Sequence, residues 1–123
     1  MKILYLLRYY PTLTETFVYD EIDGLATSGF GLITIVGLGK RADGVFLKTP
    51  PKADRILQLP KNRMGRWRMP NGPGFDWLKK HQRAKDVARL ESLIELTKKH
   101  DHIHVHFAGE AAEMAYAAHL ETG

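Results

Sequence analysis

The chain has 123 residues, of which 44% are hydrophobic and 26% charged, and it contains no cysteine. This length and apolar content suit one folded domain and argue against a disordered chain. The lack of cysteine excludes disulfides, thiolate metal ligands and cysteine nucleophiles, and it fits a cytoplasmic protein. Because no apolar run reaches about 18 residues and the N-terminus lacks a cleavage pattern, we expect neither secretion nor a membrane span.

The net charge of +4 is distributed unevenly. Residues 1–39 carry two cations and four anions, and residues 86–123 carry three cations and seven anions. The middle of the chain, residues 40–85, carries thirteen cations and three anions, a local charge of +10. Such a basic segment indicates an anionic partner, and nucleic acid, phospholipid and phosphorylated substrates all fit the charge alone.

The N-terminal segment has the pattern of a buried strand followed by a helix. Residues 2–7 are almost continuously apolar, which predicts a central parallel strand covered on both faces. Residues 12–15 have capping-box spacing, which predicts a helix from about residue 13 to the cap at Gly29. Ligands of open α/β sheets bind beyond the carboxyl ends of the strands, so residues 9–16 are the first candidate site.

The rest of the chain continues this alternation. Strands are predicted at residues 32–36, at residues 55–60 as an edge or late strand, and at residues 103–107. Helices are predicted at residues 75–99 and, rich in alanine, from residue 111 onward. Strands alternating with helices indicate an α/β fold with a Rossmann-like parallel sheet flanked by helices.

Three stretches, in this order, resemble one enzyme family. Residues 9–17 with Glu21, Ile22 and Leu25 resemble the opening "P-x-L-S-E-T-F…E-I…L" of family-four GT-B glycosyltransferases of bacterial exopolysaccharide and lipopolysaccharide synthesis. Residues 103–108 resemble their "I-H-x-H-F-A" strand. The C-terminal small-residue stretch, 111–123, is similar to the helix that leads into their "T-G-x-P" strand.

The resemblance covers about residues 1–36 and 103–123, and it is absent from the basic middle. The sequence departs from the family pattern at Thr14, where serine is usual, and at residues 30–31, where a histidine-glutamate pair is common. Residues 1–123 therefore resemble a partial N-terminal GT-B domain with a basic variable insertion at about 40–77.

The resemblance implies the acceptor-side half of a retaining two-domain transferase of the hexosyltransferase class, truncated at Gly123. In that family a C-terminal domain holds most of the nucleotide-sugar donor, and the acceptor is a glycan or a lipid-linked glycan. We therefore expect this chain to be inactive alone, with no catalytic residue, cofactor or metal of its own. Its expected location is cytoplasmic, with peripheral contact at the inner face of the membrane.

Carried over by position, the resemblance implies that the turn before the first helix approaches the donor phosphates or the acceptor. The turn residues concerned are Thr12, Thr14, Glu15 and Thr16. His106, near the carboxyl end of its strand, lies beside the same crevice in this interpretation. The alternative is local, because Thr12 and Glu15 also suffice to cap their own helix and a strand histidine can bond neighbouring backbone.

A loop is predicted at residues 61–73, where cations alternate with tryptophan and methionine. In the family context its function is contact with an anionic lipid-linked acceptor or membrane surface, through Arg63, Arg66, Trp67 and Arg68. The same composition permits a basic module that binds membrane or RNA, although no nucleic-acid-binding motif is present and no nucleic acid is expected. A solvated loop is the remaining alternative.

Alternating histidines give a rival hypothesis, a histidine-rich metal-binding domain. In a strand, four such residues share one face with about 6.8 Å between neighbours, close enough for His-x-His ligation. A third ligand would come from Glu110, His119 or His81 only if the fold brought it in. Hydrogen bonding within the core is the competing explanation. The four residues are His100, His102, His104 and His106.

Overall fold

The computed structural model describes residues 1–9, 16–29, 31–39, 53–59, 70–81, 86–106 and 109–123. Its elements, in chain order, are β1 (Lys2–Tyr9), α1 (Thr16–Thr27), β2 (Leu32–Gly39), β3 (Arg55–Gln58), α2 (Pro73–Lys80), α3 (Val87–Lys98), β4 (His102–His104) and α4 (Glu110–Thr122). No helix in these ranges is both long and apolar enough to cross a membrane.

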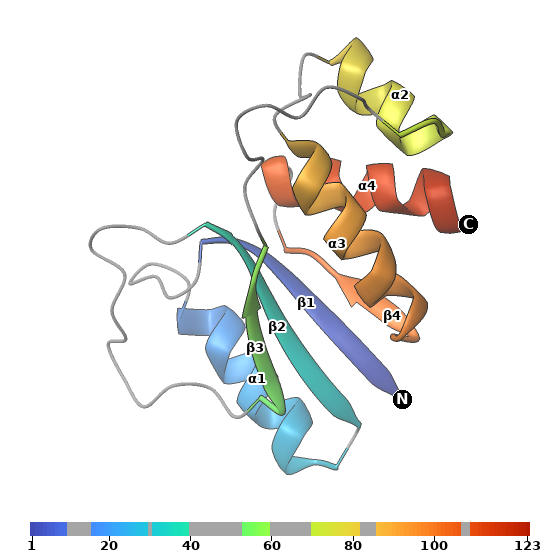
Figure 1. Ribbon diagram of the computed structural model, residues 1–123. Helices are drawn as coiled ribbons and strands as arrows, with labels where there is room; N and C mark the ends of the chain where they lie inside the picture. The colour runs from blue at the N-terminus through green and yellow to red at the C-terminus, as the bar shows by residue number, and fades with distance from the viewer. Residues whose placement is uncertain (10–15, 30, 40–52, 60–69, 82–85, 107–108) are drawn as a thin grey trace.

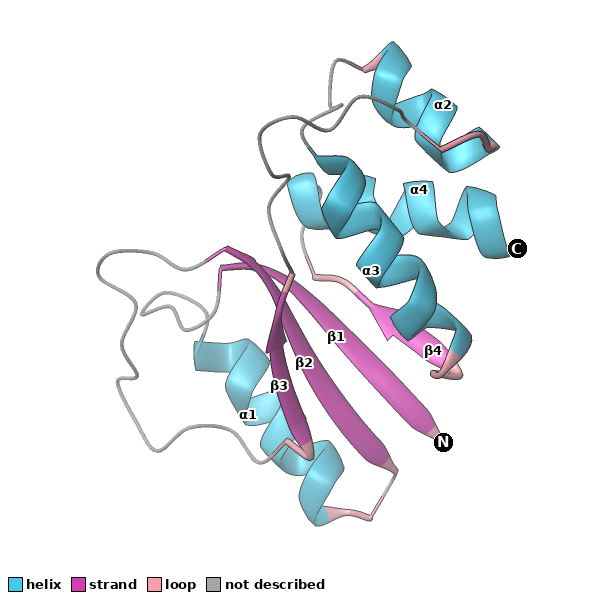
Figure 2. Cartoon of the chain, in the orientation of Figure 1, coloured by secondary structure: helices cyan, strands magenta, loops and turns pink. Residues whose placement is uncertain are grey.

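The four strands form one parallel sheet in the order β3-β2-β1-β4 (Figure 2). The chain proceeds outward from β1 through β2 to β3, and then returns to place β4 on the other side of β1. This is the order of the first four strands of a Rossmann-type sheet. The predicted α/β fold with a parallel sheet flanked by helices is thus confirmed, including the central place of β1 and the edge place of β3.

One face of the sheet is covered by α1 (Figure 1). Because side chains alternate along a strand, Ile3, Tyr5 and Leu7 of β1 share this face. They form one buried cluster with Val18 and Ile22 of α1. The amphipathic pattern of the first helix therefore predicted its packing correctly, although residues 10–15, which include its expected start, lie outside the described residues.

The opposite face of the sheet is covered by α3 and α4, and α2 lies on the outer side of α4 (Figure 1). Leu4 and Leu6 of β1 join a larger buried cluster on this side, with Leu90 and Leu93 of α3 and Met114 of α4. The small residues predicted for α4 lie in its contact with the sheet side, since its alanines pack in the same buried cluster.

The single helix predicted for residues 75–99 is wrong, because the structure has two helices, α2 and α3, in this region. The helix α2 ends at Lys80, and the backbone amide of the next residue, His81, bonds back to the carbonyl of Trp77. Residues 82–85 lie outside the described part of the chain. The strand predicted at residues 103–107 is also shorter and one residue earlier, at His102–His104.

Two aspartates hold the starts of the edge strands. Asp101, just before β4, accepts the backbone amide of Lys2 at 2.7 Å, and its own amide bonds the Lys2 carbonyl at 2.8 Å. Asp54, just before β3, makes the same pair of bonds with Ile33, at 2.7 and 2.8 Å. Each aspartate therefore fixes the register of an edge strand against the neighbouring central strand.

His100 joins the end of α3 to the sheet. Its Nδ1 lies 2.7 Å from the carbonyl oxygen of Leu96, and its Nε2 lies 2.8 Å from Oγ1 of the buried Thr34. A carbonyl oxygen accepts only, so Nδ1 carries the proton, and in the neutral ring Nε2 accepts from the threonine hydroxyl.

We expect Thr34→Val to lower the free energy of unfolding by about 1 kcal/mol, because it leaves the His100 ring without this hydrogen bond. Urea denaturation measures the change. The same substitution at the exposed Thr27 is the matched control and is expected to change stability less. Equal losses at both positions would contradict a role for the His100 bond.

Candidate functional site

Side chains from α1 and β4 meet on the α1 side of the sheet. The parallel register pairs Ile3 with His102 and Tyr5 with His104, so both histidines share the face of the sheet on which Tyr5 lies. His106 follows two residues beyond β4, and its ring stacks on Tyr5 with 6.3 Å between ring centroids. Glu21, next to the buried Ile22 on α1, reaches these rings from the helix.

The carboxylate of Glu21 is the centre of this group. Its Oε2 lies 3.1 Å from Nε2 of His106, and its Oε1 lies 3.7 Å from Nε2 of His104. The buried Tyr5 hydroxyl donates a hydrogen bond to Oε1 at 2.6 Å. The two histidine rings are in edge contact, with centroids 4.7 Å apart. We call Tyr5, Glu21, His104 and His106 the Glu21 cluster.

The surroundings shift the pKa values of two members of the cluster. Burial raises the pKa of Tyr5 well above its ordinary value, and the hydrogen bond and charge of Glu21 act in the same direction, so Tyr5 stays a donor. Burial lowers the pKa of His104; Glu21 opposes this shift, and His106 and His102 add to it. The neutral form of His104, whose imidazole has a lone pair for a ligand, is therefore favoured compared with an ordinary histidine.

A cavity of about 360 Å³ borders the cluster. Tyr5, Glu21 and His104 form one part of its wall, and His102 extends the polar part. The remaining lining is apolar and comes from the start of β1 and from α1: Met1, Ile3 and Leu25. A concave, mainly apolar space with a few polar groups at one side is the usual form of a small-molecule site.

The alternating histidines do not share one face as predicted. His102, His104 and His106 lie on the α1 side, whereas the His100 ring bonds Thr34, which is on the other face of the sheet. The reason is that the strand begins only at His102, after Asp101 has turned to bond Lys2. Period-two alternation therefore applies to three of the four residues.

The third-ligand candidates from the sequence lie elsewhere. Glu110 forms an ion pair with Arg8, His119 lines a different cavity, and the His81 ring stacks on Trp77 at 4.1 Å. The acidic residue beside the histidines is Glu21, which the sequence reasoning did not select as a ligand. The available signal was its place in the resemblance and its position next to an apolar residue of an amphipathic helix.

Among the site residues carried over from the resemblance, the structure places His106 in the Glu21 cluster, with 17% of its side chain exposed. Thr16 is the first residue of α1, and its side chain is outside the described part of the chain. The other predicted contacts also lie outside the described residues: Thr12, Thr14, Glu15, Arg63, Arg66, Trp67 and Arg68.

A salt bridge joins the carboxyl end of β1 to the start of α4, at the point where the strand order reverses. Arg8, near the carboxyl end of β1, places its Nε 2.7 Å from the carboxylate of Glu110, the first residue of α4. Both side chains are partly exposed. In open α/β sheets this switch point, between β1 and β4 here, is the usual place of the ligand crevice.

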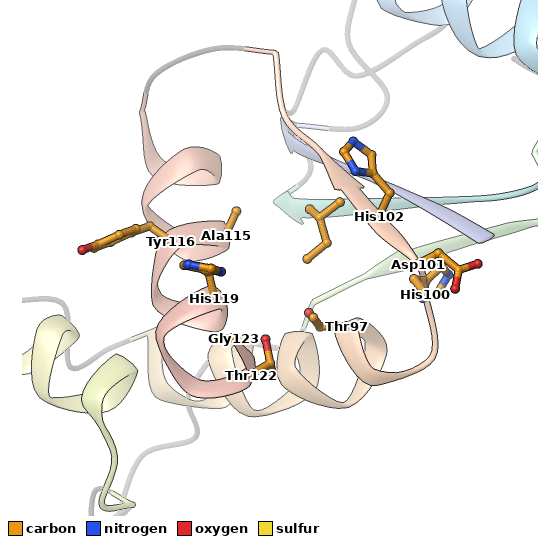
Figure 3. Close-up of a pocket in the computed structure, with 10 residues that line it drawn as sticks. Thr97, His100, Asp101, His102, Ala115, Tyr116, His119, Thr122 and Gly123 are labelled. Atoms are coloured by element: carbon orange, nitrogen blue, oxygen red, sulfur yellow. The ribbon is translucent and has the colours of Figure 1, made fainter. Parts of the chain in front are cut away.

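A second cavity, of about 440 Å³, lies between β4, α3 and α4 (Figure 3). Ala115 points from α4 toward β4, whereas Tyr116 points away. The polar groups from α3 already serve the fold: Thr97 bonds the Leu93 carbonyl at 2.8 Å, and His100 bonds Leu96 and Thr34. Asp101, which also lines this cavity, bonds the backbone of Lys2.

Comparisons with models of known protein families, with curated proteins and with solved structures find no match. What the described residues establish is the fold: a small α/β domain with a four-stranded, all-parallel, Rossmann-like sheet.

Proposed function

We propose that this chain is the acceptor-side, N-terminal part of a glycosyltransferase that moves a sugar from a nucleotide-sugar to a glycan or lipid-linked acceptor. The strand order supports the proposal, because the reversal between β1 and β4 creates the switch-point crevice at which such sheets bind ligands. The resemblance of the two ends of the sequence to family-four GT-B enzymes supplies the reaction class.

The observation that carries the proposal is the contact between two stretches of that resemblance. Glu21 comes from the first stretch, and His104 and His106 come from the "I-H-x-H-F-A" stretch near the other end of the chain. The structure brings their side chains within 3.1 and 3.7 Å of one another. Such convergence is what we expect if both stretches belong to one site rather than to two chance similarities.

In this proposal the carboxyl edge of the sheet binds phosphate groups through a positively charged side chain. The guanidinium of Arg8 has the planar donor geometry that suits phosphate oxygens, and Glu110 holds it at the crevice. The basic insertion at about 40–77 includes β3 and the start of α2, and its other residues lie mostly outside the described part of the chain. We assign its basic residues to the anionic acceptor or to the inner face of the membrane. A further domain would hold most of the donor, so catalysis is a property of the longer enzyme.

Titration of the ¹⁵N-labelled chain tests where phosphorylated ligands bind. The probes are UDP-glucose, GDP-mannose and a short-chain polyprenyl phosphate, followed by amide chemical shifts. We expect changes at the carboxyl edge of the sheet, at Arg8, His106 and Glu110, and none at the amino edge, at Lys2 and Asp101. Arg8→Ala is expected to weaken binding by about ten-fold through loss of a charge-assisted hydrogen bond.

Lys98→Ala is the control for charge alone, because Lys98 lies on α3 in an exposed pair with Glu95. Shifts confined to the amino edge, or no shift with any of the three probes, would overturn the proposal. Release of UDP or GDP by this chain without another domain would equally contradict it, because the donor site is assigned elsewhere.

A further inference from the structure

We propose that Glu21, His104 and His106 form a binding site for a zinc-class divalent cation, with Tyr5 as the residue that positions the carboxylate. The inference uses the same contacts between Glu21 and the histidines as the proposed function, but it requires no sugar transfer.

The ligand atoms already have nearly the spacing that zinc requires. One atom from each of the three side chains lies within 4.8 Å of both others. Zinc bonds to nitrogen and oxygen are about 2.0–2.2 Å long, so two ligands of a tetrahedral ion are separated by roughly 3.3–3.6 Å. The separations of 3.1 and 3.7 Å between Glu21 and the histidine Nε2 atoms bracket this value. Side-chain rotation is the movement that the three atoms need to reach one ion.

The chemistry of the donor set selects the class of metal. Two imidazoles and one carboxylate suit zinc and neighbouring first-row metals, whereas magnesium and calcium prefer sites made of oxygen ligands. Both histidine nitrogens that face the carboxylate are Nε2 atoms, so each ring approaches with the same edge. The sequence suggested His-x-His ligation with a third ligand from Glu110, His119 or His81. The fold instead places the carboxylate of Glu21 beside the histidines.

The second shell supports the same conclusion. Tyr5 is 1% exposed, and its hydroxyl donates to Oε1 of Glu21 at 2.6 Å, which orients the carboxylate toward the rings. Partners of this kind commonly fix the ligands of metal sites. Tyr5 and His104 lie on paired strands and Glu21 lies on a packed helix, so two of the three ligands are held by regular elements.

A fourth coordination position is available for a water molecule or a substrate. Three protein ligands with an open fourth position are typical of catalytic zinc sites, whereas structural sites have four protein ligands. The cavity of about 360 Å³ borders Glu21 and His104 and is otherwise mainly apolar. The proposed ion therefore has access to a space that a small molecule can enter.

Isothermal titration calorimetry of the chelator-treated 123-residue chain tests the site. We expect one Zn²⁺ per chain and no comparable binding of Mg²⁺. Glu21→Gln and His104→Ala are each expected to weaken Zn²⁺ binding by more than about ten-fold, and Tyr5→Phe by about ten-fold, with far-UV circular dichroism confirming the fold of each variant. Zn²⁺ is also expected to raise the Tm of the parent chain but not of Glu21→Gln.

Three histidine variants act as matched controls. His81 stacks on Trp77, His119 lines the other cavity, and the His102 ring centroid lies 6.1 Å from that of His104 outside the proposed ligand set. Replacing each with alanine is expected to leave Zn²⁺ affinity nearly unchanged. An unchanged affinity in Glu21→Gln, or a loss in His102→Ala equal to that in His104→Ala, would overturn the proposal in favour of a simple His-x-His contact. Absence of Zn²⁺ binding would overturn it without affecting the sugar-transfer proposal.

Discussion

Asp86→Ala is expected to lower the free energy of unfolding by about 3–5 kcal/mol. Asp86 precedes α3 and is fully buried, and its Oδ1 accepts from Nη1 of Arg89 at 2.9 Å. Arg89 is 9% exposed, and within the described residues its Nε has no hydrogen-bond partner. Removing the carboxylate therefore leaves a buried guanidinium without this counter-charge, a large penalty in the protein interior. Urea denaturation monitored by circular dichroism measures it.

The chain contains a matched control on the same helix. Glu95 and Lys98 also form a pair three residues apart, with 65% and 59% of their side chains exposed. Glu95→Ala is expected to cost less than about 1 kcal/mol, because water already solvates both charges. The double variant Asp86→Ala/Arg89→Met is expected to recover much of the loss, since it removes the stranded charge as well. If Asp86→Ala lowered the free energy of unfolding no more than Glu95→Ala does, burial of the ion pair would not be the cause of its importance.

The sheet was predictable because the residue types along each strand indicate whether the strand is buried or exposed. A strand covered on both faces has apolar residues at successive positions, and β1 shows this from Ile3 to Leu7. The edge strand predicted at residues 55–60 ends in proline, and β3, which the structure has there, is mostly exposed. These patterns are local, so they can be read without knowledge of the partner strands.

The division between α2 and α3 was not predictable from periodicity. Apolar residues recur at helical spacing on both sides of residues 82–85, which indicates that each segment has an apolar face. Periodicity does not report which surface each face contacts. Phe75 and Leu78 of α2 and Leu90 and Leu93 of α3 join one buried cluster, and both helices contact α4. α3 also covers the sheet, whereas α2 lies on the outer side of α4 (Figure 1), so the two helices take different positions and the chain breaks between them.

The Glu21 cluster was also only partly predictable from local sequence patterns. Alternation placed His104 and His106 on one face, because their spacing is a property of the strand itself. The approach of Glu21 depends on how α1 crosses the sheet, and that is set by the packing of Val18 and Ile22 against β1. His100 left the predicted face because Asp101 bonds Lys2 and delays the start of β4. Long-range contacts of this kind have no local signature in the sequence.

Gly74→Ala is the second substitution with a large expected effect. Gly74 lies in the first turn of α2, where a Cβ would meet the carbonyl oxygen of Ala117 on α4 and lie 2.8 Å from Cγ of Glu121. The carboxylate of Glu121 also accepts the amides of Gly74 and Phe75, at 2.8 and 3.4 Å, and so caps the start of α2. Because Ala117 presents backbone, α2 must move away from α4 and these bonds must lengthen.

Gly24→Ala is the matched control, because the change in the free energy of unfolding is expected to have the opposite sign at this glycine. Gly24 lies within α1, and a Cβ there meets no atom within 4 Å, so alanine is expected to raise the free energy of unfolding by about 0.5–1 kcal/mol through helix propensity alone. At Gly74 the same gain is outweighed by overpacking of about 1–3 kcal/mol, which predicts a net loss. Urea denaturation of both variants decides between the two effects. Stabilisation by both substitutions would show that α2 and α4 do not approach as closely as described, because close backbone contact is the only term that differs in sign between the two sites.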